Sequence, residues 1–268
     1  MLKVGVIGCG TIGGEICKAI DRGIVGAELV GISDIDLSRA DDLARSLKKG
    51  VRVMDQAAVI KESELVVEAT SKTVAPSIIR EVLGCSKDVL VMSVGGLLEG
   101  TDELLELAKS KGKRIYVPSG AIAGLDAVKG AIVGSVSKVT LTTRKPPAGL
   151  KGAPYIVEHE IDLENLQEPT VIFSGPAAQA VRGFPANVNV AAALSLAGIG
   201  SEKTTVCIIA DPGCDRNTHE IEVEGEFGKL VARTENVPAP FNPKTSQLAA
   251  LSAIGLLRKI TSSLVVGT

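Results

Sequence analysis

The chain has 268 residues, 45% of them hydrophobic and 22% charged, a composition ordinary for a globular protein and a length sufficient for a large core. Its 29 Lys and Arg residues nearly balance 31 Asp and Glu residues, and only 2% of the residues are aromatic. Such a chain lacks the basic surface and the stacking rings that nucleic acids and anionic membranes require. We therefore expect a small-molecule partner, no nucleic acid and no membrane.

The sequence also gives an expectation for the cellular location of the protein. The first residues have the composition of neither a secretory signal nor a transit peptide, and no segment approaches the roughly 20 apolar residues of a membrane span. Five cysteines form no CxxC pair, which argues against a disulfide framework or zinc ribbon and favours buried or half-buried thiols. A cytoplasmic location is the expectation.

The first 118 residues alternate short β-branched runs with amphipathic segments. This alternation is typical of a parallel sheet with crossover helices, a doubly wound α/β architecture. Strands are predicted at 3–7, 28–33, 65–69, 89–94 and 114–117, and helices at 12–22 and 37–48, the second with Asp36 as its N-cap.

After Pro118 strands follow one another with few helices between them. A small helical stretch at 119–134 precedes an alternating strand at 138–144 and a Gly/Pro loop at 146–154. Further strands are predicted at 171–174, 204–210 and 219–223, with 226–233 as a hairpin partner through Gly225. The pattern indicates a second, α+β domain with a mixed or antiparallel sheet.

The last predicted element is a helix over 242–260, with Asn242 as its N-cap and Pro243 at its first position. Its apolar stripe consists of Leu248, Leu251, Ile254, Leu257 and Ile260. Such a stripe needs a partner surface, so we expect the helix to pack on the first domain. The predicted domains are therefore 1–118 together with 240–268, and 119–239.

Three glycines, Gly8, Gly10 and Gly13, lie between the first strand and the first helix. This is the GxGxxG turn of Rossmann domains, in which the glycines allow a tight turn, the approach of a pyrophosphate and close helix packing. The amides of the helix start, at Thr11 and Ile12, would bind the anion. The sequence therefore predicts a dinucleotide site here.

An acidic residue is expected 20 or so residues further on, to bind the ribose hydroxyls, and Asp34 lies 21 residues beyond Gly13. Its carboxylate would repel a 2′-phosphate, which favours NAD, although Arg39 could bind that phosphate and make NADP possible. The alternative is that Asp34 only caps the following turn. Small or polar residues at the other strand ends, among them Ala69, Thr70 and Ser93, would lie along the same ligand.

A nicotinamide reaction needs a group that handles a proton, and the chain has two histidines. His159 lies among carboxylates in a stretch that resembles a solvated surface strand. His219 lies where a turn-rich loop enters a strand, so it is the better candidate for a general acid or base. We expect no metal site and no serine nucleophile, because HExxH, Cys/His clusters and GxSxG are all missing from the sequence.

Cationic and amide side chains of the second domain suit a substrate that carries carboxylates. An alternative role for each of them is a surface charge or a helix cap. The candidates are Arg144, Lys145, Asn187, Asn189, and Lys244 with Thr245 and Ser246.

Six blocks of sequence, GCGTIGG near the start and then SGAIAGLDA, LTTRKP, FPANVNVAAALSLAG, NTHEIEVEGEFG and NPKTSQLAALSAI, resemble the L-aspartate dehydrogenase family over nearly the whole chain. The resemblance implies NAD(P)-dependent oxidative deamination of L-aspartate to iminoaspartate, which hydrolyses to oxaloacetate and ammonia or supplies NAD biosynthesis. It also implies that His219 is catalytic and that Ala123 and Asn189 contact the dinucleotide.

Two other interpretations stay open at this point. Another two-domain NAD(P)-dependent reductase, acting on homoserine or dihydrodipicolinate, would combine the same domain types. A dinucleotide-sensing protein without catalysis would need a further partner module, and the sequence contains no basic helix-turn-helix that could serve as one. A homodimer is expected for the enzyme.

Overall fold

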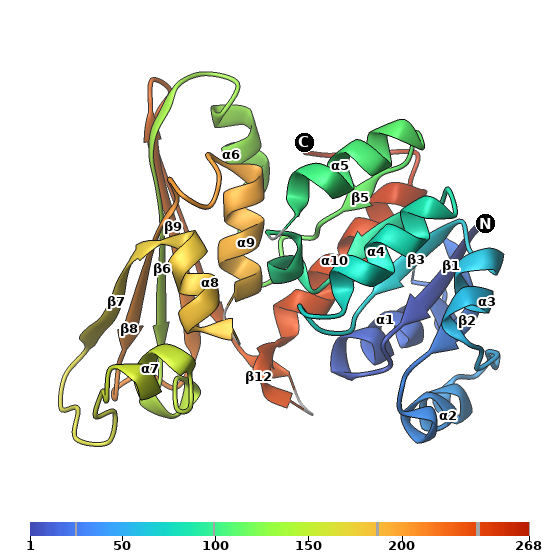
Figure 1. The fold of residues 1–268 in the computed structure, drawn as a ribbon, viewed down its shortest axis with the longest axis horizontal. Coiled ribbons are helices and arrows are strands. Elements are labelled where there is room, and N and C mark those ends of the chain that lie inside the picture. Colours follow the sequence, from blue (N-terminus) through green and yellow to red (C-terminus); the bar gives the residue numbers. More distant parts are fainter. Residues whose placement is uncertain (25, 99, 186–187, 240–241, 268) are drawn as a thin grey trace. The chain divides into compact units, whose positions relative to one another are not determined.

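A computed structural model describes every residue except 25, 99, 186–187, 240–241 and 268, and every side chain except those and 188 and 242–244. The chain divides into two compact units, each with its own main sheet (Figure 1). Met1–Pro118 and Ala249–Val266 form the first unit, and Ser119–Leu248 forms the body of the second.

The first unit contains a parallel sheet of five strands in the order β2-β1-β3-β4-β5. The strand order reverses beside β1, so the predicted doubly wound Rossmann sheet is confirmed. Strands β3 and β4 are buried along almost their whole length, as expected for a sheet covered on both faces. The strands are β1 (Leu2–Ile7), β2 (Ala27–Ser33), β3 (Leu65–Glu68), β4 (Asp88–Val91) and β5 (Ile115–Tyr116).

Helices connect these strands and cover the sheet (Figure 1). Asp36 caps α2 as predicted, because its carboxylate accepts a hydrogen bond of 3.3 Å from the Arg39 amide. The helices are α1 (Thr11–Asp21), α2 (Leu37–Ser46), α3 (Gln56–Glu62), α4 (Ala75–Gly84), the 3₁₀ turn η1 (Val94–Leu97) and α5 (Thr101–Ser110).

The start of the last helix differs from the prediction. Residues Asn242–Ser246 form strand β12, which pairs with β11 (Pro238–Ala239), and α10 covers Gln247–Thr261. Asn242 is therefore not the N-cap; Ser246 takes that place, since its hydroxyl accepts a 3.2 Å hydrogen bond from the Leu248 amide. Ala253 and Leu257 pack in the core of the first unit, whereas Leu251 of the predicted stripe is exposed.

The second unit contains a five-stranded sheet in the order β10-β9-β6-β8-β7. Only the β6–β8 pairing is parallel among these neighbours, so the predicted mixed sheet is confirmed. Gly225 pairs with Gly228, which moves the predicted hairpin strand from 226 to 228 and leaves a two-residue turn. The strands are β6 (Val136–Lys145), β7 (Thr170–Pro176), β8 (Thr205–Ala210), β9 (Asn217–Gly225) and β10 (Gly228–Asn236).

Helices α8 and α9 pack on one face of this sheet (Figure 1). Alternate residues of the central strands, such as Leu141 on β6 and Ile221 on β9, form the core beneath them. The helices are α6 (Leu125–Ala131), the 3₁₀ turn η2 (Pro147–Gly149), α7 (Pro154–Glu158), α8 (Ala177–Gly183) and α9 (Val188–Ala197).

His159 is not on a strand, contrary to the prediction. It follows the short helix α7, is exposed, and stacks its ring on Tyr155 with the ring centroids 3.9 Å apart. The alternating pattern around it reflects an exposed helix end rather than a pleated surface. Of the cysteines, Cys9 and Cys17 are buried and Cys207 and Cys214 half-buried as expected, whereas Cys85 is exposed.

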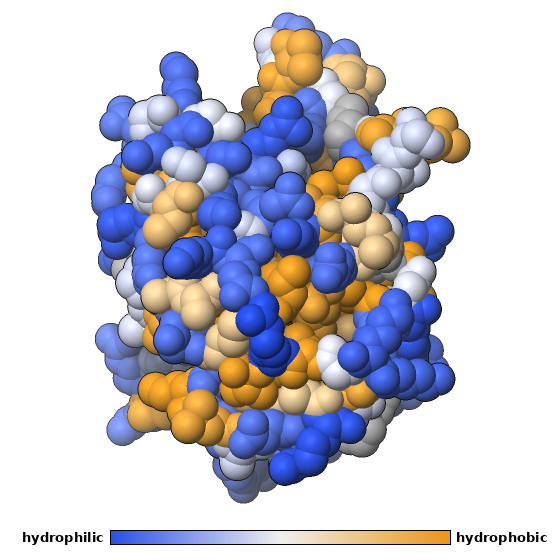
Figure 2. Space-filling view, turned by 90° about the vertical axis from the view of Figure 1, so that its right-hand side faces the viewer, coloured by the Kyte–Doolittle hydropathy of each residue, from blue (hydrophilic) through white to orange (hydrophobic). Residues whose placement is uncertain are grey.

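Across the described ranges, we find no helix with the length and apolar character needed to cross a membrane. Figure 2 shows a face of the molecule on which hydrophobic side chains form a patch bordered by hydrophilic ones.

Candidate functional site

The glycine-rich turn between β1 and α1 contains two glycines that packing requires. Gly8 has a φ of +100°, and a Cβ there would come within 2.3 Å of the Ala69 carbonyl oxygen. A Cβ on Gly13 would lie 1.9 Å from the carbonyl oxygen of Gly8. Both positions therefore hold helix α1 and the turn tightly against the ends of β1 and β3.

Gly10 differs from both, because a Cβ there would have no atom of the described residues within 4 Å. It is also the N-cap of α1, and no described side chain caps the helix start formed by Thr11 and Ile12. An uncapped helix N-terminus beside an open glycine leaves amide groups to bind an anion. The geometry of the turn thus fits the pyrophosphate of a dinucleotide.

Asp34 follows β2 and contacts the glycine-rich turn. Its Oδ2 accepts a 2.6 Å hydrogen bond from the Cys9 amide, and its Oδ1 accepts one of 2.9 Å from the Asp36 amide. The carboxylate therefore both caps a turn and lies beside the glycines. Arg39 Nη1 lies 3.8 Å from Oδ2, so a cation stands beside the carboxylate, as the sequence suggested.

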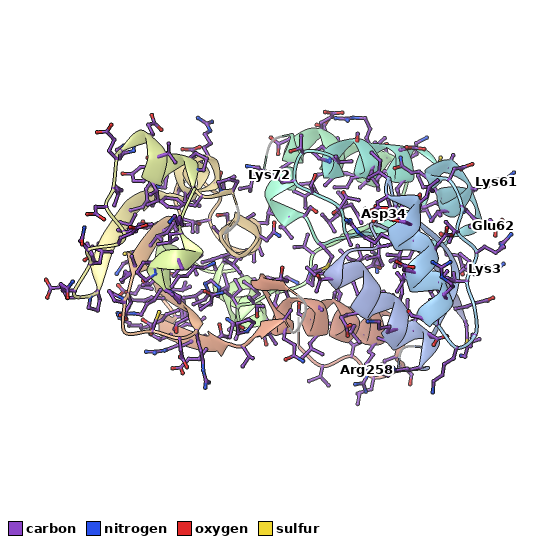
Figure 3. All side chains as sticks on the ribbon, turned by 90° about the horizontal axis from the view of Figure 1, so that it is seen from below. Lys3, Asp34, Lys61, Glu62, Lys72 and Arg258 are labelled. Atoms are coloured by element: carbon purple, nitrogen blue, oxygen red, sulfur yellow. The ribbon has the colours of Figure 1, made fainter. Side chains whose placement is uncertain are left out.

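A second, polar groove of the first unit lies at the opposite, amino-terminal edge of the sheet. Lys3, Lys61 and Glu62 are among the residues that line it. Figure 3 shows these three residues grouped together and Asp34 apart from them. Because ligands of open α/β sheets bind beyond the carboxyl ends of the strands, this groove is not the predicted dinucleotide site.

A buried glutamate at the ends of β3 and β4 was missed by sequence reasoning. Glu68 is 0% exposed, and its carboxylate accepts hydrogen bonds from the amide and hydroxyl groups of both Thr70 and Ser93. The signal was present in the sequence, because a charged residue interrupts the apolar run LVVEAT of a strand expected to be buried.

In the second unit, His219 on β9 lies opposite Thr143 on β6. Its Nδ1 is 3.0 Å from the Thr143 hydroxyl, and the imidazole is 5% exposed. Lys145 lies two residues further along β6, on the same face of the sheet, and is 7% exposed. One face of the sheet therefore brings together an imidazole, a hydroxyl and an ammonium group.

Burial sets the charge of these groups. It lowers the pKa of His219 to about 3, with a smaller contribution from the positive charge of Lys145. Burial also lowers the pKa of Lys145 to about 8. At neutral pH the imidazole is therefore uncharged. Lys145, by contrast, carries its ammonium charge in most molecules.

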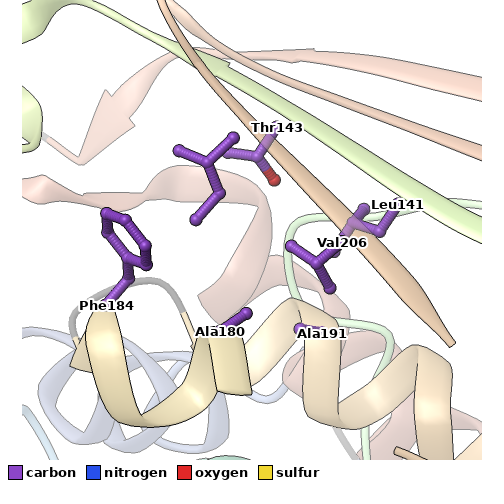
Figure 4. Close-up of a pocket in the computed structure, with 7 residues that line it drawn as sticks. Leu141, Thr143, Ala180, Phe184, Ala191 and Val206 are labelled. Carbon is purple, nitrogen blue, oxygen red and sulfur yellow. The ribbon is translucent and has the colours of Figure 1, made fainter. Parts of the chain in front are cut away.

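Thr143 also lines a small, mainly apolar pocket (Figure 4). The pocket lies between the sheet and helices α8 and α9, with Phe184 on one side. Its lining residues are Leu141, Thr143, Ala180, Phe184, Ala191, Val206 and Ile208. The polar groups of β6 thus lie at the border of an apolar interior, where electrostatic interactions are strong.

Arg144 lies on the opposite face of β6, since successive side chains of a strand alternate. Its Nη1 donates a 2.7 Å hydrogen bond to Asp211 Oδ2, and this guanidinium holds the pKa of Asp211 below its usual value. The structure therefore does not bring Arg144 to His219. Of the two neighbouring cationic candidates, Lys145 is the one that follows the inward alternation of Leu141 and Thr143.

The remaining predicted residues lie in several places. Ala123 is exposed and lies two residues after Ala121. The carbonyl oxygen of Ala121 accepts hydrogen bonds from Thr234 and Asn236. Asn189 is exposed in the first turn of α9, and Thr245 is half-buried on β12. Asn187 and the side chain of Lys244 lie outside the described residues.

In the described part of the chain, no group of three potential metal ligands occurs, and the expectation of no metal stays a prediction.

Two family models together match most of the chain. Residues 126–260 match the family model described as aspartate dehydrogenase, C-terminal, and residues 8–118 match the one described as homoserine dehydrogenase, NAD binding domain. An L-aspartate dehydrogenase of Methanosarcina acetivorans is 52% identical over the full length of both chains. The chain belongs to the aspartate dehydrogenase family.

Further relatives in this family cover the chain equally well. An L-aspartate dehydrogenase of Bradyrhizobium diazoefficiens is 43% identical over all of this chain and 94% of its own. The crystal structure of the Thermotoga maritima aspartate dehydrogenase is 26% identical, with a TM-score of 0.77 and full coverage of both chains. The resemblance seen in the sequence is confirmed: the protein is an oxidoreductase that uses NAD(P).

Proposed function

We propose that the protein catalyses the NAD(P)-dependent oxidative deamination of L-aspartate, giving iminoaspartate that hydrolyses to oxaloacetate and ammonia. The relatives that carry the name L-aspartate dehydrogenase match it over its full length. The observation that carries the proposal is the buried set of His219, Thr143 and Lys145 on one face of the second sheet. This set combines a proton acceptor with a cation suited to a carboxylate.

The dinucleotide would be held by the first unit. Gly10, Thr11 and Ile12 would bind the pyrophosphate at the uncapped start of α1, while Gly8 and Gly13 keep the turn close to the sheet. Asp34 would bind the adenosine ribose, which favours NAD over NADP. Ala69, Thr70 and Ser93 of the first unit, together with Ala123 and Asn189 of the second, complete the proposed contacts.

Lys145 is the strongest candidate for a carboxylate of the substrate. It is buried on the face that carries His219, and a buried ammonium ion binds a carboxylate more strongly than an exposed one does. Arg144 is the competing candidate, although it bonds Asp211 on the other face. Asn187, Lys244 and Thr245 are also kept in this proposal as substrate-binding residues.

His219 would move the protons of the reaction. Its imidazole is uncharged at neutral pH, and when Nδ1 donates to the Thr143 hydroxyl, Nε2 is left as an unprotonated acceptor. Nε2 could then take a proton from the substrate ammonium group and release it to solvent. Later it could take a proton from the water that adds to the imine carbon and give it to the nitrogen that leaves as ammonia. A bound nicotinamide accepts the hydride that leaves the aspartate Cα.

The use of iminoaspartate in NAD biosynthesis, a cytoplasmic location and a homodimeric assembly belong to the same proposal. The activity itself is tested by following the absorbance of reduced nicotinamide with L-aspartate, D-aspartate, L-glutamate and L-homoserine. We expect turnover with L-aspartate. Turnover with L-homoserine alone would favour a homoserine enzyme, and binding of NAD without turnover of any of the four would favour a sensor.

A further inference from the structure

Glu68 is a buried carboxylate at the carboxyl end of an apolar strand, and four hydrogen bonds compensate its burial. It ends β3, is 0% exposed, and an uncompensated carboxylate there would be strongly unfavourable. Its Oε1 accepts hydrogen bonds from the Thr70 amide (2.7 Å), the Thr70 hydroxyl (2.7 Å) and the Ser93 hydroxyl (2.8 Å). Its Oε2 accepts one of 3.1 Å from the Ser93 amide.

These bonds join the ends of two neighbouring strands. Thr70 follows β3 and Ser93 follows β4, so one side chain fixes two loops at the carboxyl edge of the sheet. The same edge carries the glycine-rich turn, because Gly8 packs against the carbonyl oxygen of Ala69. Glu68 therefore supports the edge on which a dinucleotide binds.

The strand order shows which half of the dinucleotide reaches these loops. Asp34 follows β2, and the pyrophosphate site lies after β1 at the start of α1. With the order β2-β1-β3-β4, an adenosine held at Asp34 leaves the nicotinamide riboside to extend over β3 and β4. Thr70 and Ser93 would thus lie under that half of a bound dinucleotide.

The direction of the hydrogen bonds decides what the two hydroxyls can offer. A carboxylate only accepts, so both hydroxyls give their single proton to Glu68. Toward a ligand, the two hydroxyl oxygens can therefore only accept a hydrogen bond. Thr70 is exposed, so its oxygen is the one that a ligand reaches first, whereas Ser93 is 7% exposed.

We propose that Glu68 is a positioning residue for the cofactor, which fixes the Thr70 and Ser93 hydroxyls as acceptors for hydrogen-bond donors of the nicotinamide riboside. The available donors are the ribose hydroxyls and the carboxamide NH₂ group. A protonated or amide side chain at this position would instead donate to the hydroxyls and let them turn their protons toward the ligand.

The test compares binding of NADH, ADP-ribose and ADP to the wild-type protein and to Glu68→Gln, Thr70→Val and Thr70→Ser, by calorimetry. Thr70 is exposed, so its variants keep the fold even where Glu68→Gln is less stable. We expect Glu68→Gln and Thr70→Val to weaken NADH binding by about tenfold, the scale of one or two lost hydrogen bonds, and Thr70→Ser to restore it. ADP, which lacks the nicotinamide riboside, should bind equally to all variants.

ADP-ribose distinguishes the two donors. Weakening with ADP-ribose as well as NADH assigns the hydroxyls to the ribose, and weakening with NADH alone assigns them to the carboxamide. NADH binding unchanged by Thr70→Val, or ADP binding weakened as much as NADH binding, would overturn the proposal. The test needs no turnover of aspartate, so its outcome is independent of the proposed activity.

Discussion

Thr143 and His219 face each other across β6 and β9, with the threonine hydroxyl 3.0 Å from Nδ1 of the imidazole. Both side chains are buried on the face of the sheet that packs against helices, and Lys145 shares that face. The pair fixes the direction of the ring and leaves Nε2 for chemistry, as an orienting hydroxyl does in an acid–base site. The consequences of this arrangement can be measured.

The burial of His219 makes stability depend on pH in the acid range. Its pKa is about 3 in the folded protein and 6.5 when unperturbed, so between these values the unfolded chain binds a proton that the folded chain does not. The free energy of unfolding should therefore fall as the pH falls from 6.5 toward 3, by up to about 1.4 kcal/mol per pH unit from this group. Urea titrations of the wild type and His219→Gln measure the difference in slope.

The exposed His159 provides the matched control for that experiment. His159→Gln should keep the wild-type pH slope, whereas His219→Gln should flatten it. Equal slopes in all three proteins would show that the His219 imidazole is protonated as readily in the folded state as in the unfolded one.

Lys145 should matter for the KM of L-aspartate. Lys145→Gln removes the buried ammonium ion and should raise KM by on the order of tenfold or more, the scale of a charge-assisted hydrogen bond. In the wild type, kcat/KM should fall above pH about 8, as Lys145 loses its proton. Initial rates across substrate concentration and pH measure both effects.

Arg144→Gln tests the competing assignment in the same assay. Arg144 bonds Asp211 on the opposite face, so we expect its variant to change KM much less than Lys145→Gln does. A larger rise in KM for Arg144→Gln would move the substrate carboxylate to Arg144.

Gly10 should be required for the cofactor but not for the fold. A methyl group at Gly10 contacts none of the described atoms, so Gly10→Ala should fold, yet it would occupy the side from which the pyrophosphate approaches. We expect NADH binding to weaken by at least about tenfold, with little change in Tm. Gly14→Ala is the control, because its Cβ would lie 3.7 Å from Leu43, an ordinary contact. NADH binding weakened equally by both variants would contradict the assignment.

The preference between NAD and NADP should depend on Asp34. Asp34→Ser removes the carboxylate and leaves Arg39 beside the ribose site, so kcat/KM for NADP relative to NAD should rise by at least about tenfold. Asp36→Ser, which removes a neighbouring carboxylate but keeps a side chain able to cap α2, is the control. The same ratio in both variants would show that Asp34 does not contact the 2′ position.

Much of the fold follows from local patterns that the sequence carries. The alternation of strands and helices predicted the parallel sheet, and Asp36 predicted the start of α2. Pairing between distant or competing segments was harder to predict. Asn242 and Pro243 read as a helix start, but pairing with Pro238–Ala239 makes them a strand, and Ser246 caps the helix instead.

In the candidate site, too, the features set by local sequence could be predicted, and those set by distant segments could not. The glycine-rich turn has a sequence signature because Gly8 and Gly13 have no room for a Cβ, while Gly10 leaves open space for a ligand. For Glu68 the sequence shows only a charge within an apolar run, because its partner Ser93 lies 25 residues away, after the next strand. Lys145 and Arg144 are neighbours in sequence, and the alternation along β6 together with its pairing to β9 places the lysine on the face that carries His219.

In the proposed reaction, His219 carries the proton chemistry of L-aspartate oxidation. The most direct measurement is the rate of NADH formation from L-aspartate by His219→Ala, together with NADH binding to the same variant. We expect kcat to fall on the order of 100-fold or more, the usual contribution of a general acid or base, while the affinity for NADH stays that of the wild type. Turnover of L-aspartate at the wild-type rate would contradict it.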